Sequence, residues 1–172
     1  MRPKVALVLL RLWLGVWFVL AGYPKLSKEY FATSEGNPGL KTSPAYRKSL
    51  ECMLTNFAEK GAMDLYRPFL KNVVLRNVKI FAALTAFGEV AAGVALIGGL
   101  LTHFASLAIV VMCGNYFLAT YNFGGASQTA NVACVAIALA LVVGAAGQYA
   151  GLDALGGGGK KGAAAPPKKG SG

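Results

Sequence analysis

The stretch TAFGEVAAGVALIGG, residues 85–99, holds a single carboxylate, Glu89, within a run of apolar and small residues. Apolar residues continue on both sides, from Val78 to about Leu101. A helix of about 20 residues, rising 1.5 Å per residue, is long enough to cross the hydrocarbon core of a membrane. A charge inside such a helix is unfavourable unless something compensates it. The stretch therefore predicts a membrane-spanning helix in which Glu89 has a partner.

The composition of the whole chain also indicates a membrane protein. Of its 172 residues 55% are hydrophobic, and the mean hydropathy is +0.52. We predict an all-α fold, an integral membrane four-helix bundle built as one domain by residues 1–155. Its apolar runs place the four spanning helices at about 4–24, 77–101, 103–121 and 128–148.

Two segments lie outside the predicted spans. In the long connection 25–76, residues 44–60 have the spacing of an amphipathic helix, with Pro44 at its first position and Gly61 at its end. This helix could pack on the bundle, lie on the bilayer or dock on a partner. A short helix beginning near Pro68 is expected to run into the second span. The tail 156–172, GGGGKKGAAAPPKKGSG, is predicted to be flexible.

The net charge of +10 lies mostly outside the spans. Because these charges flank membrane spans, we expect no nucleic acid as partner. The expected partners are anionic lipid headgroups or an acidic partner subunit. The basic N-terminus and the lysines of the tail predict that both termini are cytoplasmic. The expected location is the cell membrane of a prokaryote, crossed several times.

Arg11 and Glu89 are the deepest ionisable residues in the predicted spans. Counted from Gly22 and from Val78, both lie about 16 Å below the same membrane face. We therefore hypothesise a structural ion pair between Arg11 and Glu89. The alternative is that Glu89, the one catalytic candidate, handles protons at a quinone or ion site.

Small residues recur at helical spacing in the predicted spans, and such residues let helices approach closely in lipid. The predicted packing residues are Gly15, Gly22, Gly88, Ala91, Ala95, Gly99, Ala136, Ala140 and Gly144. Cys113 and Cys134 are expected to pack as small hydrophobes. The sequence contains no metal-ligand cluster and no cofactor ligand set of its own, so the expected small-molecule ligands are limited to a quinone or a lipid.

Three segments together resemble the DoxX family. They are RLWLGVWFVLAGYPKL (11–26), FGEVAAGVALIGGLLTHFASLAIVVM (87–112) and GAAGQYAGLDAL (144–155). The resemblance implies a four-helix membrane protein associated with membrane oxidoreductase assemblies, including thiosulfate:quinone oxidoreduction. It also implies framework or site roles at the matching positions Arg11, Gly15, Gly22, Lys25, Gly88, Glu89, Gly93, Gly98 and Asp153.

The chain departs from the family pattern at His103, where an arginine is common, and in a longer insertion at 27–65. The expected function is an accessory subunit that stabilises or docks a larger membrane electron-transfer complex, with other membrane subunits and lipid as partners and without catalysis by this chain alone. The alternative is a quinone-site subunit of a thiosulfate:quinone-type oxidoreductase. A small transporter ranks last, because no inverted repeat or broken helix is evident.

Overall fold

The computed structural model describes residues 3–26 and 44–153. The predicted tail and residues 27–43 of the 27–65 insertion lie outside the described residues. The described helices are α1 (Pro3–Gly22), α2 (Pro44–Asn56), α3 (Arg67–Phe69), α4 (Val78–Gly98), α5 (Thr102–Ala119) and α6 (Ala126–Val143). Shorter helical turns connect them: η1 (Tyr23–Lys25), η3 (Phe57–Gly61), η4 (Leu70–Val74), η5 (Leu75–Asn77) and η6 (Ala146–Gln148).

Among the described residues, four helical segments are long and apolar enough to cross a membrane. They are Lys4–Lys25, Arg67–Gly98, Thr102–Ala119 and Ala126–Val143. The second is longer than predicted, because the short helix expected near Pro68 continues through η4 and η5 into α4. The prediction of an all-α membrane four-helix bundle is confirmed.

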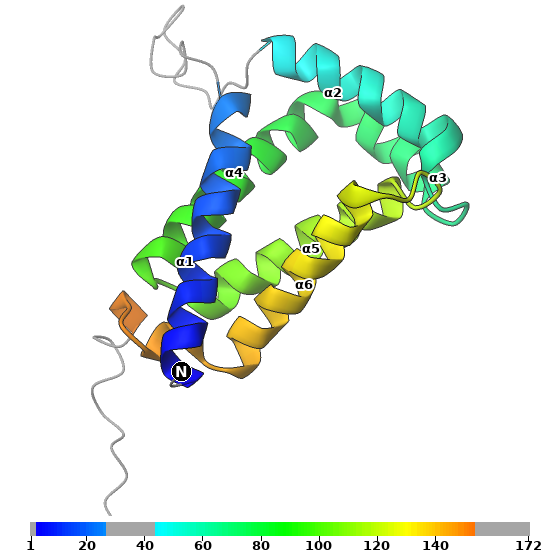
Figure 1. Cartoon of the computed structure of the whole chain (residues 1–172). Coiled ribbons are helices and arrows are strands. Elements are labelled where there is room, and N and C mark those ends of the chain that lie inside the picture. Colours follow the sequence, from blue (N-terminus) through cyan, green and yellow to red (C-terminus); the bar gives the residue numbers. More distant parts are fainter. Residues whose placement is uncertain (1–2, 27–43, 154–172) are drawn as a thin grey trace, which may run out of the picture.

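The long helices pack as two pairs. Figure 1 shows α1 (blue) beside α4 (green) and α5 beside α6 (yellow), with α2 lying across the top. The two pairs share a central core of Leu14, Phe18, Leu96, Ile109 and Leu141. The predicted cysteine packing is confirmed, since Cys113 and Cys134 belong to this core and are buried.

The close contact between α1 and α4 depends on glycines. A Cβ at Gly15 would lie 2.9 Å from the Gly93 carbonyl oxygen, and a Cβ at Gly22 would lie 2.9 Å from the Glu89 Cβ. A Cβ at Gly144 would lie 2.8 Å from Leu7 of α1. A Cβ at Gly88 would lie 3.4 Å from Met112 of α5, which is an ordinary contact. These glycines therefore act as helix-packing residues, as predicted, and Gly93 supplies the α4 side of the α1 contact.

Part of the predicted packing set does not pack inside this chain. Ala91, Ala136 and Ala140 are exposed on its surface. The reason is helix rotation: α6 turns Cys134, Ala138 and Leu141 toward the interior, and α4 turns Ala92, Gly93 and Leu96. Ala95 is half-buried and packs against the central core.

The predicted amphipathic helix is present as α2 and η3, and it packs on the bundle rather than apart from it. Leu54 and Ala58 pack with Leu70 and Val74, which precede α4, and with Ala119 at the end of α5. We call this group the α2 core. α2 thereby covers the segment that leads into α4.

Helix ends follow local backbone chemistry. Gly99 ends α4 in the left-handed region, with φ of 62°, where glycine carries little strain. The fourth span was predicted to continue to residue 148, but α6 ends at Val143. Ala145 takes a φ of 47°, which breaks the helix, and the chain turns into η6.

Candidate functional site: the Glu89 cluster

The end of α1 positions a lysine against α4. Pro24 cannot continue the hydrogen bonding of α1, and the chain tightens into the η1 turn that ends at Lys25. Gly22 leaves room for this approach, because a Cβ there would lie within 2.8 Å of Val90 and 2.9 Å of Glu89. Lys25 is thereby brought to the one carboxylate of α4.

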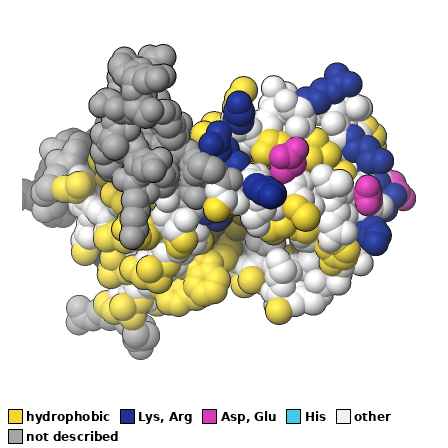
Figure 2. Space-filling model, turned by 90° about the horizontal axis from the view of Figure 1, so that it is seen from above, with side chains coloured by type: hydrophobic (Ala, Val, Ile, Leu, Met, Phe, Trp, Pro, Cys, Tyr) yellow, Lys and Arg dark blue, Asp and Glu magenta, His cyan; other side chains and the backbone are white. Residues whose placement is uncertain are grey.

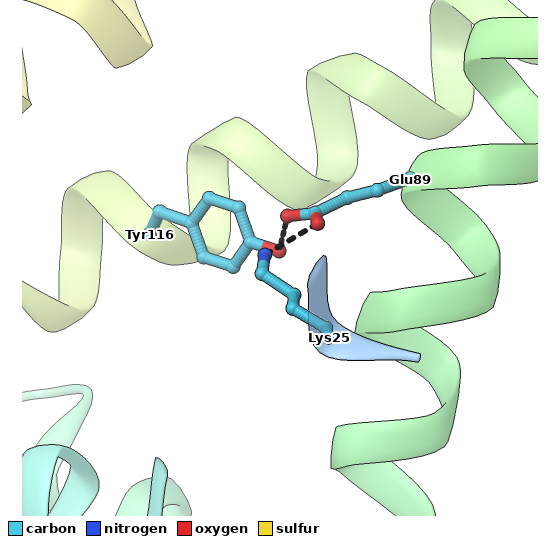
Figure 3. Close-up of polar contacts among 3 residues, drawn as sticks. All are labelled: Lys25, Glu89 and Tyr116. Atoms are coloured by element: carbon cyan, nitrogen blue, oxygen red, sulfur yellow. Dashed lines mark hydrogen bonds and ion pairs between the residues drawn. The ribbon is translucent and has the colours of Figure 1, made fainter. Parts of the chain in front are cut away.

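Glu89 is buried at 2% exposure, and both its oxygens have partners. The Lys25 ammonium forms an ion pair with Oε2, and the Tyr116 hydroxyl donates a hydrogen bond of 2.9 Å to Oε1. Figure 3 shows the Lys25 and Tyr116 side chains converging on the carboxylate. The charge of Glu89 is therefore compensated by a lysine from η1 and by a hydrogen bond from a tyrosine of α5.

Tyr46 of α2 also contacts Lys25. The Lys25 ammonium lies 5.8 Å from the centre of the Tyr46 ring, within the range of a cation–π contact. Burial, reinforced by the negative charge of Glu89, raises the pKa of Tyr46 to about 12. We use the name Glu89 cluster for Lys25, Tyr46, Glu89 and Tyr116, which come from η1, α2, α4 and α5.

The fold is expected to be sensitive to the loss of a single partner from this cluster. Removing one partner of a buried ion pair typically costs about 3–5 kcal/mol, because the other charge stays buried without compensation. Lys25 keeps a side-chain exposure of 24%, whereas the Glu89 side chain has 3%. The carboxylate is therefore the member that depends most on its partners.

The hypothesis of an Arg11–Glu89 ion pair is wrong. Arg11 is 1% exposed, and its guanidinium donates to three carbonyl oxygens near η6: Ala146 at 3.1 Å, Tyr149 at 3.1 Å and Ala150 at 2.8 Å. Along α4, Arg11 lies level with Gly99, while Glu89 lies level with Gly22. Ten residues of helix separate Glu89 from Gly99, about 15 Å. The depth estimate failed because α1 is shifted along α4 relative to the predicted span ends.

Asp153 joins Arg11 at the far end of the bundle. Its carboxylate accepts hydrogen bonds from the backbone N–H groups of Leu101 at 2.7 Å and Thr102 at 2.9 Å, and so caps α5. Burial by itself would raise the pKa of Asp153, but the hydrogen bonds from Thr102 and Leu101, with the charge of His103, outweigh it and lower the pKa. We call Arg11, Gly99, Gly151 and Asp153 the basal clasp; a Cβ on Gly99 would lie 2.6 Å from the Arg11 Nη1.

A family model described as DoxX matches residues 6–122. The chain belongs to the DoxX family. The match includes α1, α2, α4 and α5, and with them every member of the Glu89 cluster. The resemblance noted at 144–155 lies beyond it. Comparison with curated proteins and with solved structures finds no match.

Most members of the site in this DoxX-family protein were missed from the sequence. Lys25 entered only as a matching family position, and Tyr46 and Tyr116 were not considered as partners of Glu89. One signal was available: Lys25 is the first cation after α1, directly beyond Pro24. The two tyrosines had no spacing that distinguished them from the other tyrosines of the chain.

The chemistry available to the cluster is that of one carboxylate, one ammonium and hydroxyl groups. Within residues 3–26 and 44–153, no group of three His, Cys, Asp or Glu side chains could hold a metal ion. The Lys25 ammonium keeps further N–H donors of the kind that a carbonyl oxygen accepts, whereas the single O–H of Tyr116 is already donated to Glu89. The arrangement can therefore hold helices together, and it could orient a carbonyl ligand.

Proposed function

We propose that this DoxX-family protein is an accessory membrane subunit of an oxidoreductase complex, which it stabilises or docks. The family resemblance implies association with such assemblies. The observation that carries the proposal is that both oxygens of Glu89 are engaged within the chain, by Lys25 and Tyr116. A buried carboxylate that is engaged in this way joins η1, α4 and α5 and serves as a framework.

The outward surface of the spans supports a docking role. Only 17% of the residues in the α6 span window are buried inside the structure, compared with 33% for α5. Val132, Leu139 and Val143 of α6 are exposed at 53%, 44% and 87%. In a membrane this surface faces lipid or another subunit, and small residues between these side chains would let a neighbouring helix approach. Other membrane subunits and lipid are accordingly the proposed partners.

A quinone-site subunit is the second candidate, favoured by the tyrosines around Glu89. The Tyr116 hydroxyl already donates to the carboxylate, and the Tyr46 ring lies over Lys25. A quinone bound here would supply two-electron redox chemistry, and the Lys25 ammonium and the Tyr46 hydroxyl are the groups that would hold it. The residues of this chain would orient the ring and hold a proton at Glu89 or Tyr116.

Purification from native membranes in mild detergent tests both candidates. Stoichiometric co-elution with cofactor-bearing subunits is expected. Glu89→Gln should reduce assembly, whereas the matched change Glu59→Gln, on an exposed carboxylate of η3, should not. Thermal unfolding of each purified variant shows whether lost assembly follows from lost folding.

Tyr116→Phe is a smaller change that distinguishes the accessory role from the quinone site. It removes one hydroxyl and keeps the ion pair between Lys25 and Glu89. Normal assembly with lost quinone-dependent turnover would favour the quinone site over the accessory role. Normal assembly with normal turnover would leave the accessory role as the supported one. A protein that migrates alone and binds no quinone would contradict both.

A further inference from the structure

A basic groove lies between α2 and the start of α4, away from the Glu89 cluster. It has a volume of about 580 Å³. Its charged lining consists of Arg47, Lys48, Arg76, Lys79 and Glu51. The cations outnumber the carboxylate, so the groove favours an anion. Figure 2, which views this end of the molecule from above, shows lysine and arginine side chains across the part that is not grey, with few acidic ones.

The groove lies at the expected level of a membrane surface. Lys79 is nineteen residues from Gly98, the last residue of α4. A helix of that length spans about 28 Å, close to the thickness of about 30 Å of a bilayer core. If the α4–α5 turn marks one face of the hydrocarbon, Arg76 and Lys79 stand at the other face, where lipid phosphates lie.

An apolar stripe leads from the groove down the outside of α4. Ile80 lines the groove and is 58% exposed. Leu84 and Val94, exposed at 62% and 56%, follow on the same helix face, together with the exposed Ala91. A cationic groove that opens onto an exposed apolar track matches a molecule with an anionic head and a hydrocarbon tail.

Arg47 adds a further indication. Its Nε is buried, and no hydrogen-bond partner for it lies among the residues that the structure describes. A buried donor without an acceptor is unfavourable, and guanidinium groups pair well with phosphate oxygens. A phosphate in the groove would offer this guanidinium an acceptor.

We infer that the groove between α2 and α4 binds the headgroup of an anionic phospholipid, with an acyl chain along Ile80, Leu84 and Val94. The phosphate contacts the cations of the groove, and the apolar track excludes water from the chain. This site is separate from the Glu89 cluster and does not depend on the proposed function.

Native mass spectrometry of the full chain in detergent, titrated with phosphatidylglycerol or phosphatidylcholine, tests the inference. Phosphatidylglycerol should bind at least tenfold more tightly. The double variant Arg76→Gln/Lys79→Gln should weaken its binding about tenfold, since basic residues near an anionic lipid surface each contribute to the attraction. The matched control Lys60→Gln/Lys71→Gln removes the same charge from exposed positions that do not line the groove, and it should bind as the unchanged protein does.

Competition separates a lipid from other anions. Glycerol 3-phosphate and an acidic peptide should displace phosphatidylglycerol only weakly, because neither uses the apolar track. Ile80→Ala/Leu84→Ala should weaken binding of the long-chain lipid but not of a short-chain analogue. Equal binding by the groove variant and its control would overturn the site, and effective displacement by either soluble anion would overturn the lipid as its occupant.

Discussion

At the scale of single residues, one buried carboxylate determines what lies around it. Glu89 has an ion pair with Lys25 and a hydrogen bond from Tyr116, and Tyr46 lies over the lysine. Because these residues come from four separate elements, their contacts depend on one another. Arg11 belongs to a different group, the basal clasp, although both buried charges lie in the α1–α4 pair.

A double-mutant cycle tests which cation compensates Glu89. Lys25→Met should lower the free energy of unfolding by about 3–5 kcal/mol, because it leaves the buried Glu89 carboxylate without its cation. Glu89→Gln should lower it less, because the Lys25 side chain is 24% exposed, and the double variant should lose much less than the sum of the two. Reversible unfolding in mixed detergent micelles measures these values. In contrast, Arg11→Gln and Glu89→Gln should add within about 0.5 kcal/mol. Strong coupling in that second pair would contradict the separation of the two groups.

Tyr46 provides a pH test of the same cluster. Its pKa in the folded protein is raised from the ordinary value of 10.0 to about 12, mainly by burial and then by the negative charge of Glu89. A raised pKa means that the folded state holds the proton more tightly. The stability linked to Tyr46 is therefore complete below pH 10 and is lost as the pH rises from 10 toward 12.

Tyrosinate absorbance during an alkaline titration measures this. Tyr46→Phe should remove a step near pH 12, and Glu89→Gln should move that step to lower pH because it removes the nearby negative charge. An unchanged titration in Glu89→Gln would show that the carboxylate does not act on Tyr46.

At the scale of elements, close packing of α1 on α4 fixes which residues meet. Gly15 and Gly93 bring the helix backbones together, and this contact sets the offset that places Lys25, not Arg11, beside Glu89. Hydrophobic runs predicted the four spans well, since burial in lipid requires long apolar helices. They could not predict the offset, because span ends do not reveal how far one helix slides along another.

The rotation of each helix about its own axis could not be predicted from the sequence either. Small residues show that a close contact is possible on a helix face, but not which face turns inward. Gly15 and Gly22 accordingly lie in the α1–α4 contact, whereas Ala136 and Ala140 face outward from the bundle. The amphipathic pattern of α2 did carry this information, because its polar and apolar faces differ.

Glycine substitutions test the α1–α4 contact. Gly93→Ala would place a Cβ 2.7 Å from the Gly15 carbonyl oxygen, so it should lower the free energy of unfolding by about 1–3 kcal/mol. Gly114 of α5 is the matched control, because a Cβ there meets nothing within 4 Å. Gly114→Ala should leave stability unchanged or raise it by up to about 1 kcal/mol through the better helix propensity of alanine. Equal effects of the two changes in unfolding experiments would argue against a tight contact at Gly93.

At the scale of the whole molecule, the part of the chain that the structure describes has two apolar centres. The central core joins the two helix pairs, and the α2 core holds α2 over the segment that leads into α4. The Glu89 cluster includes residues from both regions, through Tyr46 of α2 and Tyr116 of α5. Because the central core and the α2 core are separate clusters, we expect α2 to loosen without unfolding of the α5–α6 pair, although the Glu89 cluster links the two regions.

Leu70→Ala tests that division. Leu70 is 2% exposed and belongs to the α2 core, so its truncation should cost about 2–5 kcal/mol locally. Hydrogen exchange followed by mass spectrometry should show faster exchange in α2 and in residues 67–77, with α5 and α6 still protected. Uniformly faster exchange along the chain would instead mean that the two centres unfold as one unit.

The basal clasp has a consequence for synthesis. Arg11 emerges from the ribosome early, but its acceptor at Ala146 lies 135 positions later in the chain. At about 5–20 residues per second, the nascent guanidinium waits on the order of ten seconds before its acceptors are made. During that interval the Arg11 charge must stay near water or be shielded by the membrane-insertion machinery. Chains that terminate just after α6 never acquire those acceptors, and quality-control proteases should remove them.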